Sequence, residues 1–421
     1  MSIRTGDRQL IKELNIALVM NLIRQHEPIS RVEIAERTGL GRSTVTGIIS
    51  TLLREGLVQE IGSADSVSGR KPVLLAFNAQ ARFAVGIKLA PRSATGALVD
   101  LNARVLHTRQ VALNPAQGPE SVIADLVRLL DLLLAESGVD REALLGAGLV
   151  MPGVVDPATG TAIASYFLGW ANLPIRDILE QELDLPVYVD NDANAMALAE
   201  ALYGAGRGVG DMLGLTVGVG IGSGVIIDGQ IHRGARFSAG ELGHTCVDPV
   251  GPACVCGRRG CLEAVAGDAA IVRRARQEMT AGRTPLLSVL ARGHADLVTR
   301  EMVVEAALAG DDGARFVLAE AGRWIGLAVG NAVNLLSPAR VVVGGEAVIQ
   351  AGDLILEPLR QQVAATCFPS CPDPNMVTLA SLGANAWLQG AAALVLKDAF
   401  EVPIRQQHAN AMARKVGSPS S

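Results

Sequence analysis

The chain has 421 residues, of which 49% are hydrophobic, and it carries a net charge of -5. This length and composition allow two or three domains with sizeable cores, and the acidic balance excludes a protein coated throughout with basic residues for nucleic acid. The N-terminus lacks the apolar core of a secretory signal and no apolar run is long enough to cross a bilayer, so we expect a cytoplasmic protein without a membrane partner.

The first eighty residues predict a winged helix-turn-helix domain. Apolar residues at helical spacing from Leu10 to Leu22 predict a first helix, which Pro28 ends. Ser30, with Glu33 three residues later, forms a capping box for a second helix, and a glycine-containing turn leads to a third. The segments "LVQEIG" and "KPVLLAFN" then predict two strands around a flexible tip, which form the wing.

Polar residues at the start of the third predicted helix suit phosphate oxygens and base edges in a major groove, and basic residues at the wing tip suit the DNA backbone. The alternative is a packing module whose charged face is only solvated. The order of turn, polar face and wing favours DNA binding. The expected DNA-binding residues are Arg42, Ser43, Thr44, Thr46, Arg70 and Lys71.

From about Phe83 onwards, hairpin strands are followed by alternating strands and helices, and this pattern occurs twice. It predicts two related α/β lobes with a ligand cleft between them. The segment "VYVDNDANA" predicts a strand that ends at Asn191 and Asp192 and opens a helix. The Asp192 carboxylate could cap that helix or accept a proton from a sugar hydroxyl, and the sequence leaves both roles open.

The stretch "GELGHTCVDPVGPACVCGRRGCLEA", which begins at Gly240, contains one histidine and four of the six cysteines of the chain. Such a cluster could form disulfides or bind a metal. In a cytoplasmic protein the thiols stay reduced, so a metal is favoured.

The motifs "PGVVD", "LGWANLPI", "VDNDANA", "VGIGSG", "GELGH", "CVCGRRGCLEA" and "VVVGGE" resemble, in order and spacing, those of the ROK family (repressors, open reading frames and sugar kinases). The N-terminal domain resembles that of the repressor branch, which includes xylose-operon and N-acetylglucosamine repressors. The resemblance implies an α/β protein: a winged helix-turn-helix domain followed by a two-lobed actin-like, sugar-kinase-like (ribonuclease H-like) ATPase-type fold with a zinc knuckle. The expected domains are 1–80 (DNA binding), 81–200 (first lobe), 201–400 (second lobe with the knuckle) and 401–421 (C-terminal helix and tail).

The resemblance also implies one structural Zn2+ per chain and a sugar in the cleft. One ring nitrogen of the shared histidine would hold the metal while the other faces the sugar. Cys246 lies outside the family pattern, and Tyr166-Phe167 replaces the Pro-Asn of xylose-type regulators, which makes the pocket more aromatic. The implied zinc ligands are His244, Cys254, Cys256 and Cys261. The implied sugar-binding residues are Gly153, Asn191, Asp192, Glu241, His244 and Glu263.

The two phosphate loops of the family's kinases are degenerate in this chain. In the segment Lys88–Arg92, a lysine replaces the first loop's aspartate and Pro91 removes an amide donor, while Val219 removes the hydroxyl of the second loop. Only the Gly344-Gly345 turn survives. We therefore expect no enzyme activity, with Asp192 as a vestigial base.

The expected function is a sugar-responsive DNA-binding transcriptional regulator, a repressor of carbohydrate uptake or metabolism genes. Its expected partners are palindromic operator DNA, a small sugar effector and further copies of itself in a homodimer or homotetramer. One alternative is an ATP-dependent sugar kinase with an appended DNA-binding domain. Another is a zinc-stabilised scaffold that has lost ligand binding.

Overall fold

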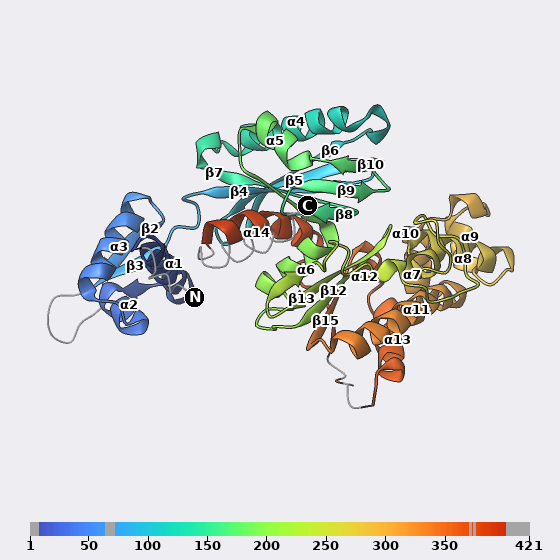
Figure 1. Cartoon of the computed structure of the whole chain (residues 1–421). Helices are drawn as coiled ribbons and strands as arrows, with labels where there is room; N and C mark the ends of the chain where they lie inside the picture. The colour runs from blue at the N-terminus through green and yellow to red at the C-terminus, as the bar shows by residue number, and fades with distance from the viewer. Residues whose placement is uncertain (1–7, 64–71, 370–372, 374–375, 401–421) are drawn as a thin grey trace, which may run out of the picture.

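The computed structural model describes residues 8–63, 72–369, 373 and 376–400. Its N-terminal domain is a three-helix unit with a small antiparallel sheet in the strand order β1-β3-β2 (Figure 1). The elements are α1 (Arg8–His26), β1 (Ile29–Ser30), α2 (Arg31–Thr38), α3 (Arg42–Arg54), β2 (Val58–Ser63) and β3 (Val73–Phe77). The predicted Arg70, Lys71 and C-terminal tail 401–421 lie outside the described residues.

The predicted capping box of the second helix is confirmed. The Glu33 amide donates to Ser30 Oγ at 3.3 Å, and the Ser30 amide donates to Glu33 Oε2 at 2.9 Å. The helix ends at Gly39, whose φ of 70° lies in the left-handed region that a side chain disfavours. These local signals fix the turn between α2 and α3.

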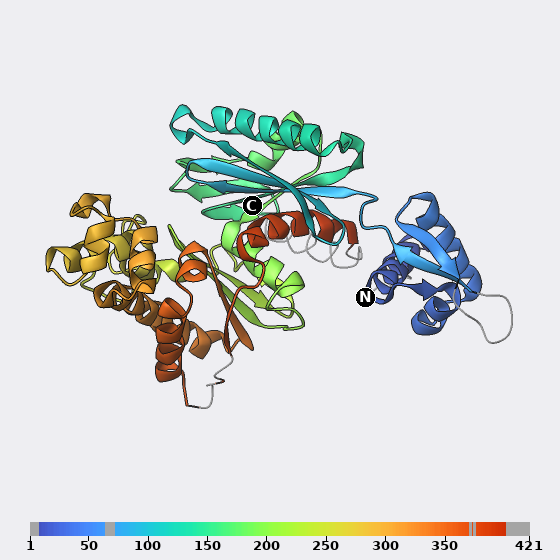
Figure 2. The ribbon, with the colours of Figure 1, turned by 180° about the vertical axis from the view of Figure 1, so that it is seen from behind.

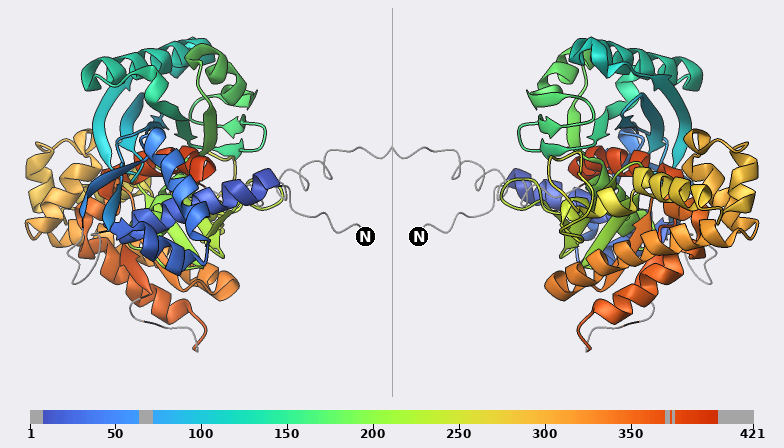
Figure 3. Two further views of the ribbon diagram at one scale, coloured as in Figure 1. Left: turned by 90° about the vertical axis from the view of Figure 1, so that its left-hand side faces the viewer. Right: turned by 90° about the vertical axis from the view of Figure 1, so that its right-hand side faces the viewer.

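The first lobe has a five-stranded sheet in the order β11-β7-β4-β5-β6. Helices α4 and α5 cover its outer face (Figure 3). The elements are β4 (Phe83–Ala90), β5 (Ser93–Asp100), β6 (Val105–Ala112), α4 (Pro119–Ser137), β7 (Leu144–Met151), α5 (Ile175–Leu183) and β11 (Val187–Asn191). A three-stranded sheet adds β8 (Val154–Asp156), β9 (Thr161–Ser165) and β10 (Trp170–Leu173).

The second lobe repeats this plan with the strand order β14-β13-β12-β15-β16. Its strands are β12 (Met212–Val217), β13 (Ile221–Ile227), β14 (Gln230–His232), β15 (Arg340–Gly344) and β16 (Val377–Leu379). Its peripheral helices are α7 (Leu262–Ala266), α8 (Asp268–Thr280), α9 (Pro285–Leu290), α10 (Arg300–Leu308), α11 (Asp312–Leu336), α12 (Glu346–Ala351) and α13 (Asp353–Thr366). The predicted pair of α/β lobes is thus present. No helix among the described residues is long and apolar enough to span a bilayer.

Two helices, α6 (Asp192–Tyr203) and α14 (Ala386–Phe400), lie between the lobes (Figure 2). Glycines allow their close packing: a Cβ at Gly148 of β7 would lie 1.9 Å from the Ala391 carbonyl oxygen of α14. A Cβ at Gly390 of α14 would lie 2.0 Å from the Ala195 carbonyl oxygen of α6. The chain therefore crosses between lobes through these helices, and the first turn of α6 is positioned at the interlobe cleft.

Candidate functional site

A cavity of about 570 Å³ lies between the two lobes. Its volume falls within the range of roughly 300–1,000 Å³ that is usual for small-molecule sites. Strand ends of both lobes, the start of α6 and the start of α14 contribute to its walls. All six predicted sugar-binding residues line it: Gly153, Asn191, Asp192, Glu241, His244 and Glu263.

At the start of α6, the neighbouring residues Asn191 and Asp192 have different roles. Asn191, not Asp192, is the N-cap: its Oδ1 accepts hydrogen bonds from the amides of Ala193 (2.8 Å) and Asn194 (3.1 Å). Its Nδ2 donates to the Gly153 carbonyl oxygen at 2.9 Å. Because Asn191 caps the helix, the Asp192 carboxylate, which accepts one bond from the Ala193 amide at 2.9 Å, lines the cavity instead. Burial raises the pKa of Asp192, and the charge of Lys88 lowers it.

Gly153 brings the β8–β9 hairpin close to α6. Its φ is 115°, and a Cβ there would lie 2.2 Å from the Ala164 carbonyl oxygen, so a side chain is excluded by both backbone conformation and space. Gly153 therefore lines the cavity with its backbone.

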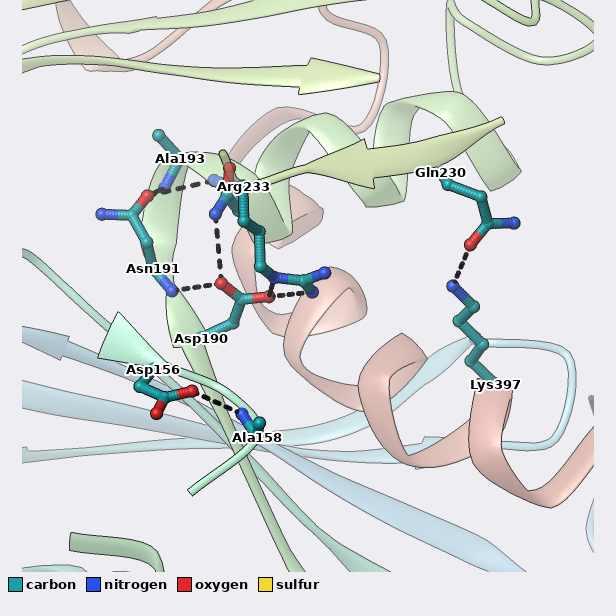
Figure 4. A network of polar contacts seen from close by, with 9 residues as sticks. Asp156, Ala158, Asp190, Asn191, Ala193, Gln230, Arg233 and Lys397 are labelled. Carbon is teal, nitrogen blue, oxygen red and sulfur yellow. Dashed lines mark hydrogen bonds and ion pairs between the residues drawn. The ribbon is translucent and has the colours of Figure 1, made fainter. Parts of the chain in front are cut away.

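A buried ion pair supports this wall of the site, and the sequence did not predict it. Asp190, 1% exposed, accepts hydrogen bonds at Oδ1 from the Asn191 amide (2.8 Å) and from Asn194 Nδ2 (3.1 Å) (Figure 4). At Oδ2 it accepts from Arg233 Nε (3.1 Å) and Nη2 (2.5 Å). Arg233 follows β14 of the second lobe, so the pair joins the strand that carries the sugar-site residues to the other lobe. The available signal was the aspartate itself, because a carboxylate inside a buried strand requires a partner.

The predicted metal ligands converge on one point. One ligand atom from each of His244, Cys254, Cys256 and Cys261 lies within 4.8 Å of the others. Cys254 Sγ lies 3.5 Å from His244 Nδ1, and Cys256 Sγ lies 3.6 Å from Cys261 Sγ. With zinc–ligand bonds of about 2.0–2.3 Å, a tetrahedral site has ligand–ligand edges of roughly 3.4–3.8 Å. The cluster therefore fits a tetrahedral metal ion. Cys246 is exposed and is not part of the cluster.

The surroundings of the thiols favour ionisation of Cys256 over that of Cys261. Burial alone would raise the pKa of Cys256, but hydrogen bonds from Arg258 and the neighbouring thiols lower it to about 6. Burial and the adjacent thiols raise the pKa of Cys261 to about 12. Binding of a divalent cation would stabilise all three thiolates. Cys256 has the lowered pKa, so its thiolate is the one most readily available to the cation.

The cysteine stretch also positions the two predicted carboxylates. Glu263, in the first turn of α7, accepts a hydrogen bond at Oε2 from the Ile221 amide of β13 at 3.1 Å. Glu241 Oε2 lies 4.0 Å from His244 Nε2, the ring nitrogen opposite the one near the thiols. Burial raises the pKa of Glu241, and His244 lowers it. His244 thus connects the metal cluster with the cavity.

The remaining wall includes the segments that the sequence analysis compared with kinase phosphate loops. Lys88, Pro91 and Val219 all line the cavity, as does Gly345. Lys88 Nζ lies 3.6 Å from the centroid of the Trp387 ring on α14. From the sequence, Lys88 was expected only to replace the aspartate of the first phosphate loop, and no role was predicted for Trp387.

The predicted DNA-contacting face of α3 is exposed. Arg42, Ser43, Thr44 and Thr46 are solvent-accessible, while the apolar residues on the other face, such as Val45 and Ile49, are buried. The Thr46 hydroxyl donates to the Arg42 carbonyl oxygen at 2.8 Å, which leaves its oxygen able to accept. The start of α3 is therefore free to enter a groove.

The fold and site define a class: a helix-turn-helix domain attached to a two-lobed α/β domain with an interlobe cavity and a Cys3His cluster that fits a metal ion. Residues 84–398 match the ROK family, and residues 16–62 match the IclR helix-turn-helix domain. The chain belongs to the ROK family, as the sequence motifs indicated.

Similar proteins include members of the repressor branch. The chain is 31% identical over 398 residues to the xylose repressor of Caldicellulosiruptor bescii, covering 94% of this chain and 99% of that protein. It is 32% identical over 356 residues to the transcriptional dual regulator NagC of Escherichia coli, covering 84% of this chain and 85% of that protein. The predicted resemblance to xylose and N-acetylglucosamine repressors is confirmed.

Solved structures of both branches are similar to this fold. A ROK family transcriptional regulator homologous to the E. coli MLC protein gives a TM-score of 0.79 at 27% identity and covers 93% of this chain and 97% of that one. A ROK family glucokinase from Streptomyces griseus, solved with glucose and AMPPNP, gives a TM-score of 0.68 at 32% identity and covers 74% of this chain and 98% of that one. The regulator matches along nearly the full length, including the DNA-binding domain, and the kinase matches the lobes.

Proposed function

We propose that this protein is a sugar-responsive transcriptional repressor that binds a neutral sugar between its lobes and couples that binding to operator DNA. The observation that carries the proposal is the convergence of six polar or close-approach residues from both lobes on one cavity, in a chain whose N-terminal domain has an exposed start of α3. Repressors among its relatives support the same assignment.

The chemistry of the cavity suits a polyol. Asp192, Glu241 and Glu263 offer carboxylate oxygens, which accept the hydroxyl protons of a sugar. Asn191 caps the helix through Oδ1 and donates one Nδ2 hydrogen to Gly153, which leaves the second Nδ2 hydrogen for the ligand. His244 Nε2 completes the polar set.

We assign Zn2+ to the Cys3His cluster as a structural ion, one per chain. Its ligands are His244 through Nδ1 and the sulfurs of Cys254, Cys256 and Cys261. When bound, the ion supplies a cross-link that fixes the histidine tautomer. The protein's own side chains contact the sugar. Because His244 is a ligand and Glu263 follows the ligand Cys261 by two residues, this cross-link orients two of the sugar-facing groups.

The kinase alternative has weaker support. Similar kinases share the lobes, but in this chain Pro91 lacks an amide donor, Val219 lacks a hydroxyl, and the Lys88 ammonium stands where a metal-binding carboxylate would be required. Phosphoryl transfer relies on positioned phosphate ligands and a magnesium ion, and these substitutions remove both. We therefore assign no enzyme activity.

The repressor is proposed to act as a homodimer or homotetramer on a palindromic operator. A single recognition helix makes few base contacts, whereas two copies contact paired half-sites on one face of the DNA. Sugar must bind one lobe arrangement more tightly than the other for the DNA-binding domains to respond.

Titration calorimetry against common aldopentoses, aldohexoses and their N-acetyl derivatives tests the assignment, combined with fluorescence anisotropy on an operator selected from random DNA. We expect micromolar to millimolar binding of at least one sugar, weaker but measurable binding in Asp192→Asn, and a changed operator affinity when the sugar is present. Sugar-dependent ATP turnover that is abolished in Asp192→Asn would instead establish the kinase. No heat for any sugar would support the scaffold.

A further inference from the structure

Lys88 occupies an unusual position for a basic residue. It lies in the last part of β4, opposite Thr95 of β5 and Val150 of β7, so it belongs to the centre of the first-lobe sheet. Its neighbours Ile87 and Leu89 are each 1% exposed and face the outer core. Because side chains alternate along a strand, Lys88 points to the opposite face, toward α14 and the cavity.

The ammonium of Lys88 is supported by an aromatic ring rather than by a hydrogen-bonded partner. Nζ lies 3.6 Å from the centroid of Trp387, which is 6% exposed, and among the described residues no hydrogen bond from this ammonium to a protein group is formed. A cation over an indole face is stabilised electrostatically, and more strongly where water is excluded. Because Lys88 also lines the cavity, its ammonium has an N–H available to a ligand there.

The charges around this ammonium couple it to the sugar site. Burial lowers the pKa of Lys88, while the carboxylates of Asp192 and Glu346 raise it. Burial raises the pKa of Asp192, while Lys88 lowers it. Each charge thus offsets part of the cost of burying the other.

The charge balance of the cavity identifies the ligand as neutral. Its lining contains the carboxylates of Asp192, Glu241, Glu263 and Glu346 against the basic side chains of Lys88 and Arg258. An anionic sugar would face this excess of negative charge, so Lys88 is already compensated and is not a phosphate site. A sugar hydroxyl, by contrast, carries no charge, and it can accept a hydrogen bond from a donor such as Lys88 while it donates one to a carboxylate.

We propose that Lys88 is a ligand-binding residue, resting on the sugar response proposed above: its ammonium, seated on the Trp387 ring, donates a hydrogen bond to the oxygen of the sugar hydroxyl whose proton Asp192 accepts. The same ammonium is the fixed counter-ion of Asp192, in place of a metal ion. Lys88 and Asp192 together select one hydroxyl of a neutral sugar.

Calorimetry of the full-length protein tests this assignment with the same sugar panel and with monodeoxy analogues of each sugar that binds. For Lys88→Met we expect the affinity to fall by roughly 10- to 100-fold, the loss of one charge-assisted hydrogen bond. Lys88→Arg should restore most of it, and one monodeoxy analogue should bind wild type and Lys88→Met equally. The exposed Lys12→Met serves as a matched control.

A double-mutant cycle separates a shared hydroxyl from a general structural effect. If both residues bind one hydroxyl, Lys88→Met combined with Asp192→Asn weakens binding no more than Asp192→Asn alone. Circular dichroism checks folding, and Lys88→Gln replaces Lys88→Met if the latter does not fold. Two results would overturn the Lys88 assignment alone. One is a sugar affinity of Lys88→Met equal to that of the wild type, and the other is additive losses of affinity in the cycle. A wild-type protein that binds no sugar would overturn the proposed function as well.

Discussion

At the scale of single residues, the buried charge of Asp190 is compensated by a partner from a distant part of the chain. Asp190 satisfies both carboxylate oxygens with groups of β11, α6 and the segment after β14. Its partner Arg233 has a side chain that is 28% exposed, so the pair is formed at the inner edge of the interlobe contact. The pair thereby fixes the strand that leads into Asn191 and Asp192.

Asp190→Asn should lower the free energy of unfolding by about 2 kcal/mol, because it removes the charge that pairs with Arg233 while the guanidinium remains partly buried. Urea denaturation followed by circular dichroism measures the change. Asp177→Asn is the matched control, since the Asp177 side chain is 62% exposed and lies 3.5 Å from Arg176. Equal effects of the two substitutions would contradict a special role for Asp190.

The residues of the cavity divide into those that the sequence could predict and those that it could not. Asn191, Glu241 and His244 stand in motifs whose local context indicates a strand end or a metal loop. The ion pair of Asp190 joins residues 43 positions apart, and Lys88 meets Trp387 from the other end of the chain. Such contacts depend on how strands and lobes are arranged in space, which local patterns do not specify.

At the scale of elements, the segment between β14 and α7 has little regular structure of its own. It contains one short 3-10 turn, Leu242–His244, and two isolated bridges, Cys246 with Cys261 and Ala253 with Arg259. A segment of this kind has few helix or sheet hydrogen bonds to stabilise it, so a metal cross-link contributes directly to its folding free energy. The folded segment in turn holds Glu241 and Glu263 at the cavity.

Removal of zinc should therefore weaken sugar binding as well as local stability. Cys256→Ser, or chelation of the wild type, should reduce bound zinc below one ion per chain and lower sugar affinity at least tenfold. Elemental analysis and calorimetry measure the two effects. Cys246→Ser, outside the cluster, should retain both zinc and affinity. Sugar affinity that persists after complete chelation would contradict the coupling.

Helix α3 carries a separate prediction, because its exposed N-terminal end is the part of a recognition helix that contacts base edges. Arg42→Ala should weaken operator binding by about 1–3 kcal/mol and leave sugar affinity unchanged. Arg54→Ala, at the exposed C-terminal end of the same helix, is the control and should have a smaller effect. Fluorescence anisotropy on the selected operator measures both. Equal loss of DNA and sugar binding in Arg42→Ala would contradict the assignment of α3.

At the scale of the whole molecule, α6 connects the sugar site with the neighbourhood of the DNA-binding domain. The helix begins with Asp192 in the cavity and ends with Tyr203. Burial raises the pKa of the Tyr203 hydroxyl, and the charge of Arg24, in α1, lowers it, so the two ends of α6 are influenced by the ligand site and by the helix-turn-helix domain respectively. Tyr203 also packs against the apolar cluster that includes Ile23 of α1 and Leu388 of α14. A sugar that shifts the first turn of α6 has a rigid element through which to reposition α1.

Tyr203→Ala should therefore uncouple the two binding events without abolishing either. Sugar affinity should stay within about twofold of wild type, and operator affinity without sugar should be retained. The ratio of operator dissociation constants with and without sugar should fall by at least about fivefold, which is the size of a typical allosteric coupling. Anisotropy titrations at zero and saturating sugar measure this ratio. Leu202→Ala, one residue earlier and 41% exposed, is the matched control and should leave the ratio unchanged. An unchanged ratio in Tyr203→Ala would show that the signal reaches the DNA-binding domain by another route, such as the β3–β4 connection.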